Sequence, residues 1–221
     1  MSKPLKIPDN WTFKSDEVAC KFNDHVREQL PWYELATGYL AHIARHYIPQ
    51  DGVVIDLGAS TGNVEHAIAD TLKDRNAKLI AVDNSPEMAK LYSGNGEFVL
   101  ADIEDYDPEP FDVAVCFLTL MFVKPSKRKM VVERLKERMN DGGALIIVDR
   151  MKPVSGYPSL VMSRLTLAEK LRVGASPDNI LRKEMSLIGV QRPIDSELVS
   201  GGHEVFRFGE FAGFILEKNN G

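Results

Sequence analysis

Short apolar runs that alternate with amphipathic segments constrain the fold of this chain more than any other feature. The runs are VVIDL at 53–57, LIAVD at 79–83, EFVLAD at 97–102, FDVAVCFL at 111–118 and ALIIVD at 144–149. Apolar residues recur at helical spacing between most of them, over about 62–74, 86–92 and 126–139. Strands this short and apolar, connected by crossover helices, form a parallel sheet that is covered on both faces. We therefore predict an α/β fold.

Segments on both sides of this alternation complete the predicted architecture. Two helices are expected before it, one between Ser15 and Pro31 and one over 33–47. A helical insert is expected over 159–190 with a break near 174–177, and the runs EVFRFG and FAGFILEK predict a terminal antiparallel hairpin. The expected organisation is one domain over 1–221, divided into N-terminal helices (1–50), a core (51–150), the helical insert (151–200) and the hairpin (201–221).

Composition argues against several kinds of protein. The chain is 44% apolar and 27% charged, as ordinary globular domains are, and its net charge of -5 gives no general attraction to nucleic acid. The most basic run, 124–129, has the spacing of a solvated helix face. Two cysteines without paired spacing predict neither a disulfide nor a zinc site, and no metal is expected. Because no signal-like or membrane-length apolar run is present, we expect a cytoplasmic protein with no membrane partner.

The turn after the first predicted strand reads D-x-G-x-x-x-G, with Asp56, Gly58 and Gly62 at the specified positions. It lacks the close glycines of the dinucleotide motif G-x-G-x-x-G and the lysine of a P-loop. A carboxylate at this place repels a pyrophosphate but attracts a cation. S-adenosyl-L-methionine carries an ammonium and a sulfonium group, and we therefore expect the turn to bind this cofactor.

Two further acids follow the next two strands. Asp83 ends LIAVD, where a carboxylate can accept hydrogen bonds from a ribose diol, and Asp102 ends EFVLAD, where the adenine would lie. Taken singly, such a residue is more often a turn residue or a helix cap. Together with the glycine turn, acids at three successive strand ends resemble the Rossmann-like class I methyltransferase fold. That resemblance implies a mostly parallel seven-stranded sheet that ends in an antiparallel hairpin.

Longer motifs make the resemblance narrower. They are FKSDEVACKFNDHVREQLPWY, VDNSPEM, FLTLMFVKPSKR, MNDGGALIIVDR and FRFGEFAGFILEK. From about Trp11 to Lys218 the chain resembles the carboxy-S-adenosylmethionine synthase family, long described as tRNA-uridine methyltransferases of the carboxymethoxyuridine pathway. The resemblance implies an S-adenosylmethionine-dependent transferase, a role in tRNA modification, and a homodimer in which the helical insert shapes the pocket entrance.

The resemblance also implies which residues contact the cofactor. Carried over by position, the family's contacts fall on Tyr33, Gly58, Ala59, Ser60, Asp83, Asn84, Asp102 and Ile103. Asp56 and Gly62 of the glycine turn, with Phe117 from the fourth predicted strand, complete the expected cofactor site. Two of these residues have ordinary alternatives, because Tyr33 could be a packed aromatic and Ile103 a plain core residue.

Two positions depart from the family. An asparagine that contacts the ligand in the family corresponds to Phe117 here. The family's arginine, which pairs with the extra carboxylate of carboxy-S-adenosylmethionine, corresponds to Glu184, and a glutamate repels a carboxylate. A shift of the alignment by two residues would place Arg182 there instead.

Catalytic residues are not assigned by the sequence, because methyl transfer needs mainly in-line positioning of the acceptor. Asp149 and Arg150, at the end of the fifth predicted strand, are candidates to orient a substrate, or they form a surface ion pair. His42 and His46 are spaced i, i+4 but lack the acid of a metalloprotease motif, which favours an exposed helix face.

Three functional hypotheses follow. The first is an S-adenosylmethionine-dependent methyltransferase that acts on an unidentified small molecule or nucleic-acid base. The second is a carboxy-S-adenosylmethionine synthase that uses prephenate and serves tRNA wobble-uridine modification. The third is a binding module without catalysis. The sequence leaves open the acceptor, and whether the cofactor is S-adenosylmethionine or its carboxy derivative.

Overall fold

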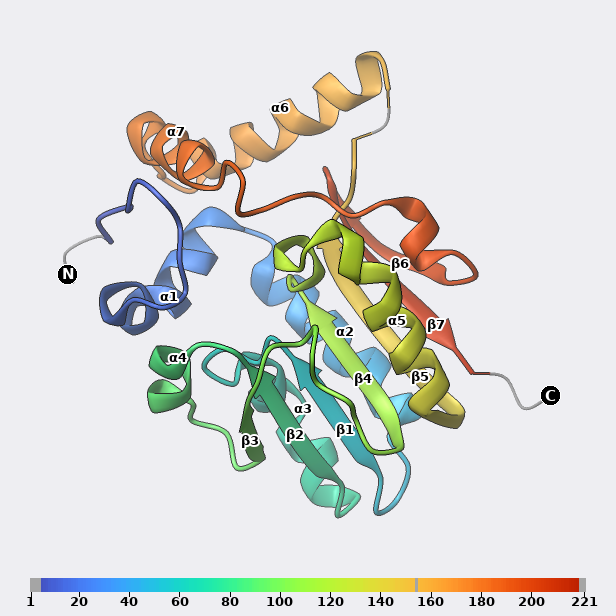
Figure 1. Ribbon diagram of the computed structural model, residues 1–221. Helices are drawn as coiled ribbons and strands as arrows, with labels where there is room; N and C mark the ends of the chain where they lie inside the picture. The colour runs from blue at the N-terminus through green and yellow to red at the C-terminus, as the bar shows by residue number, and fades with distance from the viewer. Residues whose placement is uncertain (1–4, 154, 219–221) are drawn as a thin grey trace.

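The computed structural model describes residues 5–153 and 155–218; the ends of the predicted domain, 1–4 and 219–221, and residue 154 lie outside these ranges. Its centre is a seven-stranded sheet of order β3-β2-β1-β4-β5-β7-β6 (Figure 1). The strands are β1 Val53–Leu57, β2 Lys78–Asp83, β3 Glu97–Leu100, β4 Phe111–Phe117, β5 Met139–Arg150, β6 His203–Phe208 and β7 Phe211–Glu217. The first five are parallel, and β7 pairs antiparallel with β5 and β6. The predicted α/β fold is confirmed, including its terminal hairpin.

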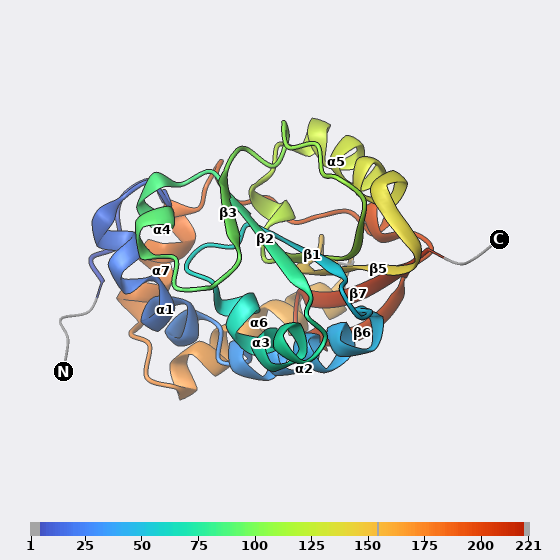
Figure 2. The same ribbon diagram turned by 90° about the horizontal axis from the view of Figure 1, so that it is seen from below.

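Helices cover both faces of this sheet, as Figures 1 and 2 show from two sides. The α-helices are α1 Asp16–Gln29, α2 Tyr33–Tyr47, α3 Asn63–Asp74, α4 Pro86–Leu91, α5 Pro125–Arg138, α6 Tyr157–Arg172 and α7 Pro177–Ser186, with short 3-10 turns η1 Leu120–Phe122 and η2 Ser196–Val199. Side chains on a strand alternate between its faces. Val54 therefore packs in the core on the side of α2 and α3, while Ile55 packs with Val131 and Leu135 of α5.

Several boundaries differ from those predicted. β3 ends at Leu100, so Asp102 lies in the turn beyond the strand. β5 begins at Met139, five residues before the predicted start, because Met139 pairs with Phe111 ahead of a register shift in the ladder. The break predicted near 174–177 in the helical insert is confirmed: the insert consists of α6 and α7, separated by a segment in which Gly174 adopts a left-handed φ of 97°.

The N-terminal segment and the helical insert meet beyond the carboxyl ends of the parallel strands (Figure 1). Ser15 and Ser176 accept hydrogen bonds from backbone N–H groups in the first turns of α1 and α7, which fixes where these helices start. The N–H of Trp11 donates to the carbonyl of Ser186 at 2.9 Å, and the Ser85 hydroxyl donates to the carbonyl of Phe13 at 2.8 Å. Residues 11–13 are thus tied both to the insert and to α4.

Helix α6 is unusually poor in buried residues. Of its 16 residues only Lys170 is buried, while Leu160, Val161, Leu165 and Leu171 are each 40–50% exposed.

Within the described chain, no helix has the length and apolar character needed to span a bilayer.

Candidate functional site

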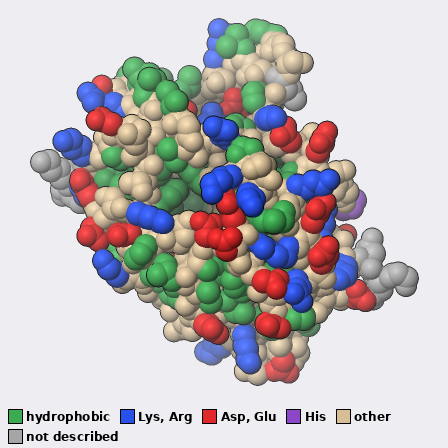
Figure 3. Space-filling model, viewed as in Figure 1, with side chains coloured by type: hydrophobic (Ala, Val, Ile, Leu, Met, Phe, Trp, Pro, Cys, Tyr) green, Lys and Arg blue, Asp and Glu red, His purple; other side chains and the backbone are tan. Residues whose placement is uncertain are grey.

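A cavity of about 360 Å³ opens where β1, β2 and β4 end, below α1 and α7. Figure 3 looks toward this side of the molecule, where hydrophobic side chains gather between acidic and basic ones. Nine of the eleven predicted cofactor residues line the cavity: Tyr33, Gly58, Ala59, Ser60, Asp83, Asn84, Asp102, Ile103 and Phe117. The fold therefore brings together residues that are up to 84 positions apart in the sequence, counted from Tyr33 to Phe117.

The glycine turn has the backbone geometry that its sequence suggests. Gly58 has a φ of 82°, and a Cβ atom at this position would lie 2.5 Å from the Thr119 hydroxyl oxygen, so only glycine fits. The N–H groups of Gly58 and Ala59 both donate to the carbonyl of Val82, at 2.8 and 3.1 Å. These bonds hold the turn against the end of β2, with its backbone along the cavity wall.

Asp83 links the glycine turn to the next strand end. Its carboxylate accepts hydrogen bonds from the N–H groups of Ser60 and Ser85, each at 2.9 Å. Burial raises the pKa of Asp83, and these backbone donors oppose the rise. The Asn84 amide donates to Asp102 at 3.3 Å, which brings the ends of β2 and β3 into one hydrogen-bonded group. Each carboxylate oxygen has two lone pairs, so acceptor capacity remains for a ligand hydroxyl.

Asp56 and Gly62 are the two predicted residues outside the cavity lining. Gly62 is the left-handed N-cap of α3, with a φ of 96°, and so it shapes the turn from behind. Asp56 is 1% exposed, and neither of its carboxylate oxygens has a hydrogen-bond partner among the described residues. Burial, together with the charges of Asp83 and Glu65, raises the pKa of Asp56 to about 8. With this pKa the carboxyl group is mostly protonated at pH 7.

Two aromatic side chains, Tyr33 and Phe117, form an apolar wall of the cavity. The rings of Tyr33 and Phe117 meet edge to face with centroids 5.3 Å apart, and both residues are buried. Burial raises the pKa of the Tyr33 hydroxyl above its usual range. Phe117 offers no polar group to a ligand, so this wall contributes shape and apolar surface only.

The two candidate catalytic residues have separate environments, and the expectation of a surface ion pair between them is wrong. Neighbouring side chains on a strand point to opposite faces. Asp149 is fully buried and accepts a hydrogen bond from the N–H of Met121 at 3.2 Å. Burial raises its pKa to about 7, against the opposing effect of backbone donors and Arg128. Arg150 lines the cavity and pairs instead with Glu210 at 2.8 Å.

The sequence did not predict that four charged residues would border the cavity together. We call this group the cavity roof; its members are Arg150, Lys170, Lys183 and Glu184. Glu184 accepts a hydrogen bond from the ammonium of Lys170 at 3.1 Å and lies 3.6 Å from the guanidinium of Arg150. Burial raises the pKa of Glu184, but Lys170 and Arg150 outweigh it and hold the pKa below its ordinary value. Lys183 lines the same roof, and all four residues border the cavity.

The alternative alignment through Arg182 is not supported by its position. Its side chain is 63% exposed and pairs with Asp178 at 2.7 Å, one turn earlier on α7. It is not among the cavity residues, whereas Glu184 is. Of the two candidate positions, Glu184 is therefore the one that borders the cavity.

The histidine pair lies away from the cavity. His42 and His46 are exposed on α2, with ring centroids 5.3 Å apart. In the ranges 5–153 and 155–218, no group of three or more His, Cys, Asp and Glu side chains is arranged to hold a metal ion.

Comparison with known proteins gives two kinds of similarity. Residues 54–143 match the model of a methyltransferase domain family. Over 224 residues the chain is 30% identical to the carboxy-S-adenosyl-L-methionine synthase of Wolinella succinogenes, covering 93% of each protein.

The similar solved structures share the fold at low sequence identity. The plantazolicin methyltransferase BpumL, in complex with a desmethyl analogue and SAH, superposes with a TM-score of 0.65 at 12% identity, over 92% of this chain and 90% of that one. Human N-acetylserotonin methyltransferase in complex with SAM gives a TM-score of 0.60 at 12% identity, over 94% of this chain but only 58% of that longer protein.

Proposed function

The chain belongs to the carboxy-S-adenosyl-L-methionine synthase family, and within it we propose a methyltransferase that uses S-adenosylmethionine itself on a small molecule or nucleic-acid base. The observation that carries this proposal is the Glu184 carboxylate at the cavity roof, bonded to Lys170 and facing Arg150. The Glu184 carboxylate offsets the charges of Lys170 and Arg150, and it repels a second carboxylate placed beside it. S-adenosylmethionine lacks that extra carboxylate and meets no such repulsion.

The residues present fit S-adenosylmethionine. Close backbone approach at Gly58–Ser60 suits the amino-acid end, and Asp83 has the place and the lone pairs to accept bonds from a ribose diol. We assign the adenine to the side of Asp102 and Ile103, and the apolar wall to Tyr33 and Phe117. When bound, the cofactor supplies an electrophilic methyl group.

The chain's own contribution to methyl transfer is then to orient and to exclude water. The buried rings of Tyr33 and Phe117 exclude water from the part of the cavity that they line, and the acceptor must approach the methyl group in line with the sulfonium bond that breaks. Arg150 is fixed by two carboxylates and by Gln191, to which it donates at 2.8 Å. We propose that it orients the acceptor and that Asp149, buried below, holds the loop at Met121.

A second candidate is a carboxy-S-adenosylmethionine synthase that uses prephenate and serves tRNA wobble-uridine modification. It is favoured by the name of the 30%-identical relative and by the cations Lys170 and Lys183 at the roof.

Mass spectrometry separates the two candidates. Purified protein is incubated with S-adenosylmethionine and prephenate, and the mass of the sulfonium cofactor is measured afterwards. We expect the cofactor mass to stay unchanged, and to see methyl transfer when a cell extract is added as acceptor source. Formation of a carboxylated sulfonium would overturn the methyltransferase proposal.

Further proposals concern organisation and location. We propose a single cooperative domain over 1–221, a homodimer, and a cytoplasmic location. The exposed apolar side chains of α6 support the dimer. One denaturation transition, sedimentation, and cell fractionation test these three statements in turn.

A further inference from the structure

Lys183 is a buried amine in the cavity without a polar partner. The residue is 8% exposed, and it borders the cavity from α7. Its Nζ atom lies over the ring of Trp11, and within residues 5–153 and 155–218 it has neither a hydrogen bond nor an ion pair. A buried ammonium without a counterion is unfavourable, so such a group is a candidate to meet a ligand's charge.

The other cations of the roof are already neutralised. Lys170 is bonded to Glu184, and Arg150 is shared between Glu184 and Glu210. On α1, His25 stacks on Trp11 with centroids 5.2 Å apart. Two carboxylates therefore balance Lys170 and Arg150, and Lys183 is the basic residue of the roof without a carboxylate partner.

The pKa values of Lys183 and His25 agree with a basic side chain that lacks a carboxylate partner. Burial first, then Lys170, lowers the pKa of Lys183 to about 5, with Glu184 acting in the opposite direction. Burial, Lys183 and Lys170 lower the pKa of His25 to about 3. Both groups are thus neutral at pH 7 in the ligand-free protein, and an anion beside Lys183 would favour its protonated form.

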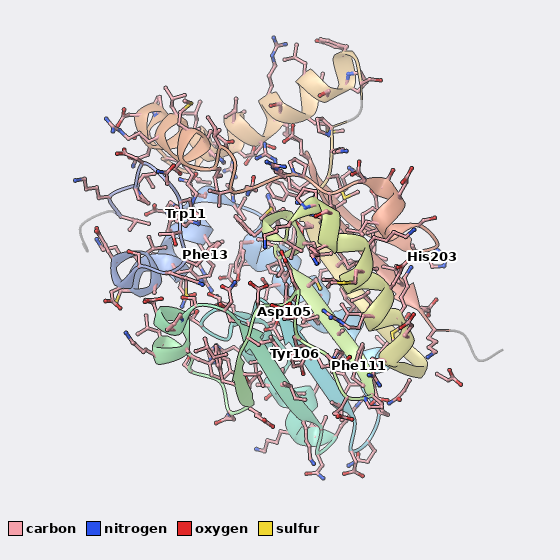
Figure 4. The ribbon with its side chains drawn as sticks, in the orientation of Figure 1. Trp11, Phe13, Asp105, Tyr106, Phe111 and His203 are labelled. Carbon is pink, nitrogen blue, oxygen red and sulfur yellow. The ribbon has the colours of Figure 1, made fainter. Side chains whose placement is uncertain are left out.

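The surroundings of Lys183 on the cavity side are aromatic. Trp11 and Phe13 of the N-terminal segment lie between α1 and α7 (Figure 4). Phe13 contacts Phe22 and Phe122 edge to face, with centroids 6.0 and 4.9 Å apart. Each of these aromatic residues borders the cavity. A ligand here needs a flat apolar body as well as an anionic group.

We propose that Lys183 and Trp11 form the acceptor subsite, and that the acceptor is an aromatic acid with one anionic group, its carboxylate paired with the Lys183 ammonium. The inference rests on the proposed function for the identity of this ligand as the methyl acceptor. One anionic group matches the single basic residue of the roof that lacks a carboxylate partner.

Calorimetry with a matched pair of probes tests the subsite. 4-Hydroxybenzoate and its neutral amide are titrated into the full-length protein, with and without saturating S-adenosylhomocysteine. The acid is expected to bind about 10- to 100-fold more tightly than the amide, the range typical of a hydrogen bond to a charged group. Comparing two buffers of different ionisation enthalpy at pH 7 should show uptake of about one proton with the acid, because Lys183 becomes protonated.

Variants assign the effect to Lys183. K183M should remove both the preference for the acid and the proton uptake, and K183R should keep the preference. K129M changes a lysine whose side chain is 83% exposed on α5, and it should behave as the wild type. Equal binding of acid and amide, binding of neither, or proton uptake that survives in K183M would overturn the proposal.

A separate measurement keeps the two proposals distinguishable. S-adenosylmethionine affinity should be the same in K183M as in the wild type, which also shows that the variant is folded. If the wild type does not bind S-adenosylmethionine, the proposed function is contradicted. The comparison of acid and amide binding in the absence of cofactor would still decide whether Lys183 forms the subsite.

Discussion

Two acidic residues, one buried and one exposed, illustrate how position decides the charge of a residue. Asp56 and Asp102 both lie near the ends of β-strands, but only Asp102 borders the cavity and is exposed. Asp56 is buried behind the glycine turn with both oxygens unpartnered. An acid in such a place is held neutral until a nearby cation stabilises its charged form. We therefore see Asp56 as a group that responds to a bound cation across the turn.

Asp56 should make stability depend on pH. Its pKa is raised from 3.8 to about 8, so between about pH 4 and 8 the unfolded chain loses this proton while the folded chain keeps it. The contribution of Asp56 to the free energy of unfolding should therefore fall as pH rises through this window. Asp149 acts in the same direction up to about pH 7, while the lowered pKa values of His25 and Lys183 act in the opposite direction. The free energy of unfolding of D56N relative to the wild type should therefore rise with pH over this window. Urea titrations at pH 5, 6, 7 and 8 measure this, and D105N, at an exposed site, is the control.

Glu184 should determine which sulfonium the cavity accepts. In E184R the roof gains positive charge beside Lys170 and Arg150, which favours a carboxylate on the ligand. The affinity ratio of carboxy-S-adenosylmethionine to S-adenosylmethionine should rise about tenfold or more, as a new charge-assisted hydrogen bond implies. E184Q, which removes the repulsion without adding a cation, should give an intermediate ratio. An unchanged ratio in both variants would remove Glu184 as a determinant.

At the scale of elements, the glycine turn acts through its connection to two neighbours. It is bonded to Val82 at the end of β2 and packed against Thr119 after β4. The positions of β2 and β4 therefore determine where the turn lies in the cavity wall. The N-terminal segment is similar, since the N–H of Trp11 donates to the Ser186 carbonyl of α7 and the carbonyl of Phe13 accepts from the Ser85 hydroxyl at the start of α4.

G58A should damage this wall. A non-glycine residue at a positive φ costs about 1–3 kcal/mol, and the added Cβ would also clash with Thr119. Cofactor affinity should fall about tenfold or more, and the melting temperature should decrease. G142A, at a positive φ but with open space around its Cβ, is the matched control and should lower stability alone. Normal cofactor binding by G58A would mean that the turn is not part of the site.

At the scale of the whole molecule, the helical insert contains the helix that buries the least of its apolar surface, α6. The sheet and its covering helices bury two apolar clusters, whereas α6 leaves its leucines half-exposed around a buried Lys170. Exposed apolar side chains gathered on one helix are typical of a surface for association. If dimerisation holds α6 in place, it also stabilises the Lys170–Glu184 pair at the cavity roof.

The dimer should depend on α6. The doubly substituted L160D/L165D should sediment as a monomer at micromolar concentrations at which the wild type is a dimer. L35D changes a leucine that is 71% exposed on α2 and should remain dimeric. A monomeric wild type, or a dimer unaffected by charges on α6, would contradict this prediction.

The sequence alone predicted the order of the elements, the antiparallel hairpin and the acids at the strand ends. These features follow from periodicity and from the backbone needs of a few adjacent residues, which are local properties. It did not predict the bond between Lys170 and Glu184, the unpartnered amine of Lys183 over Trp11, or the neutral Asp56. Trp11, Arg150, Lys170 and Glu184 come from four separate segments, so only tertiary packing brings them to one cavity. Burial then decides which of the ionisable groups carry a charge, because desolvation depends on the whole surrounding fold rather than on neighbours in the chain.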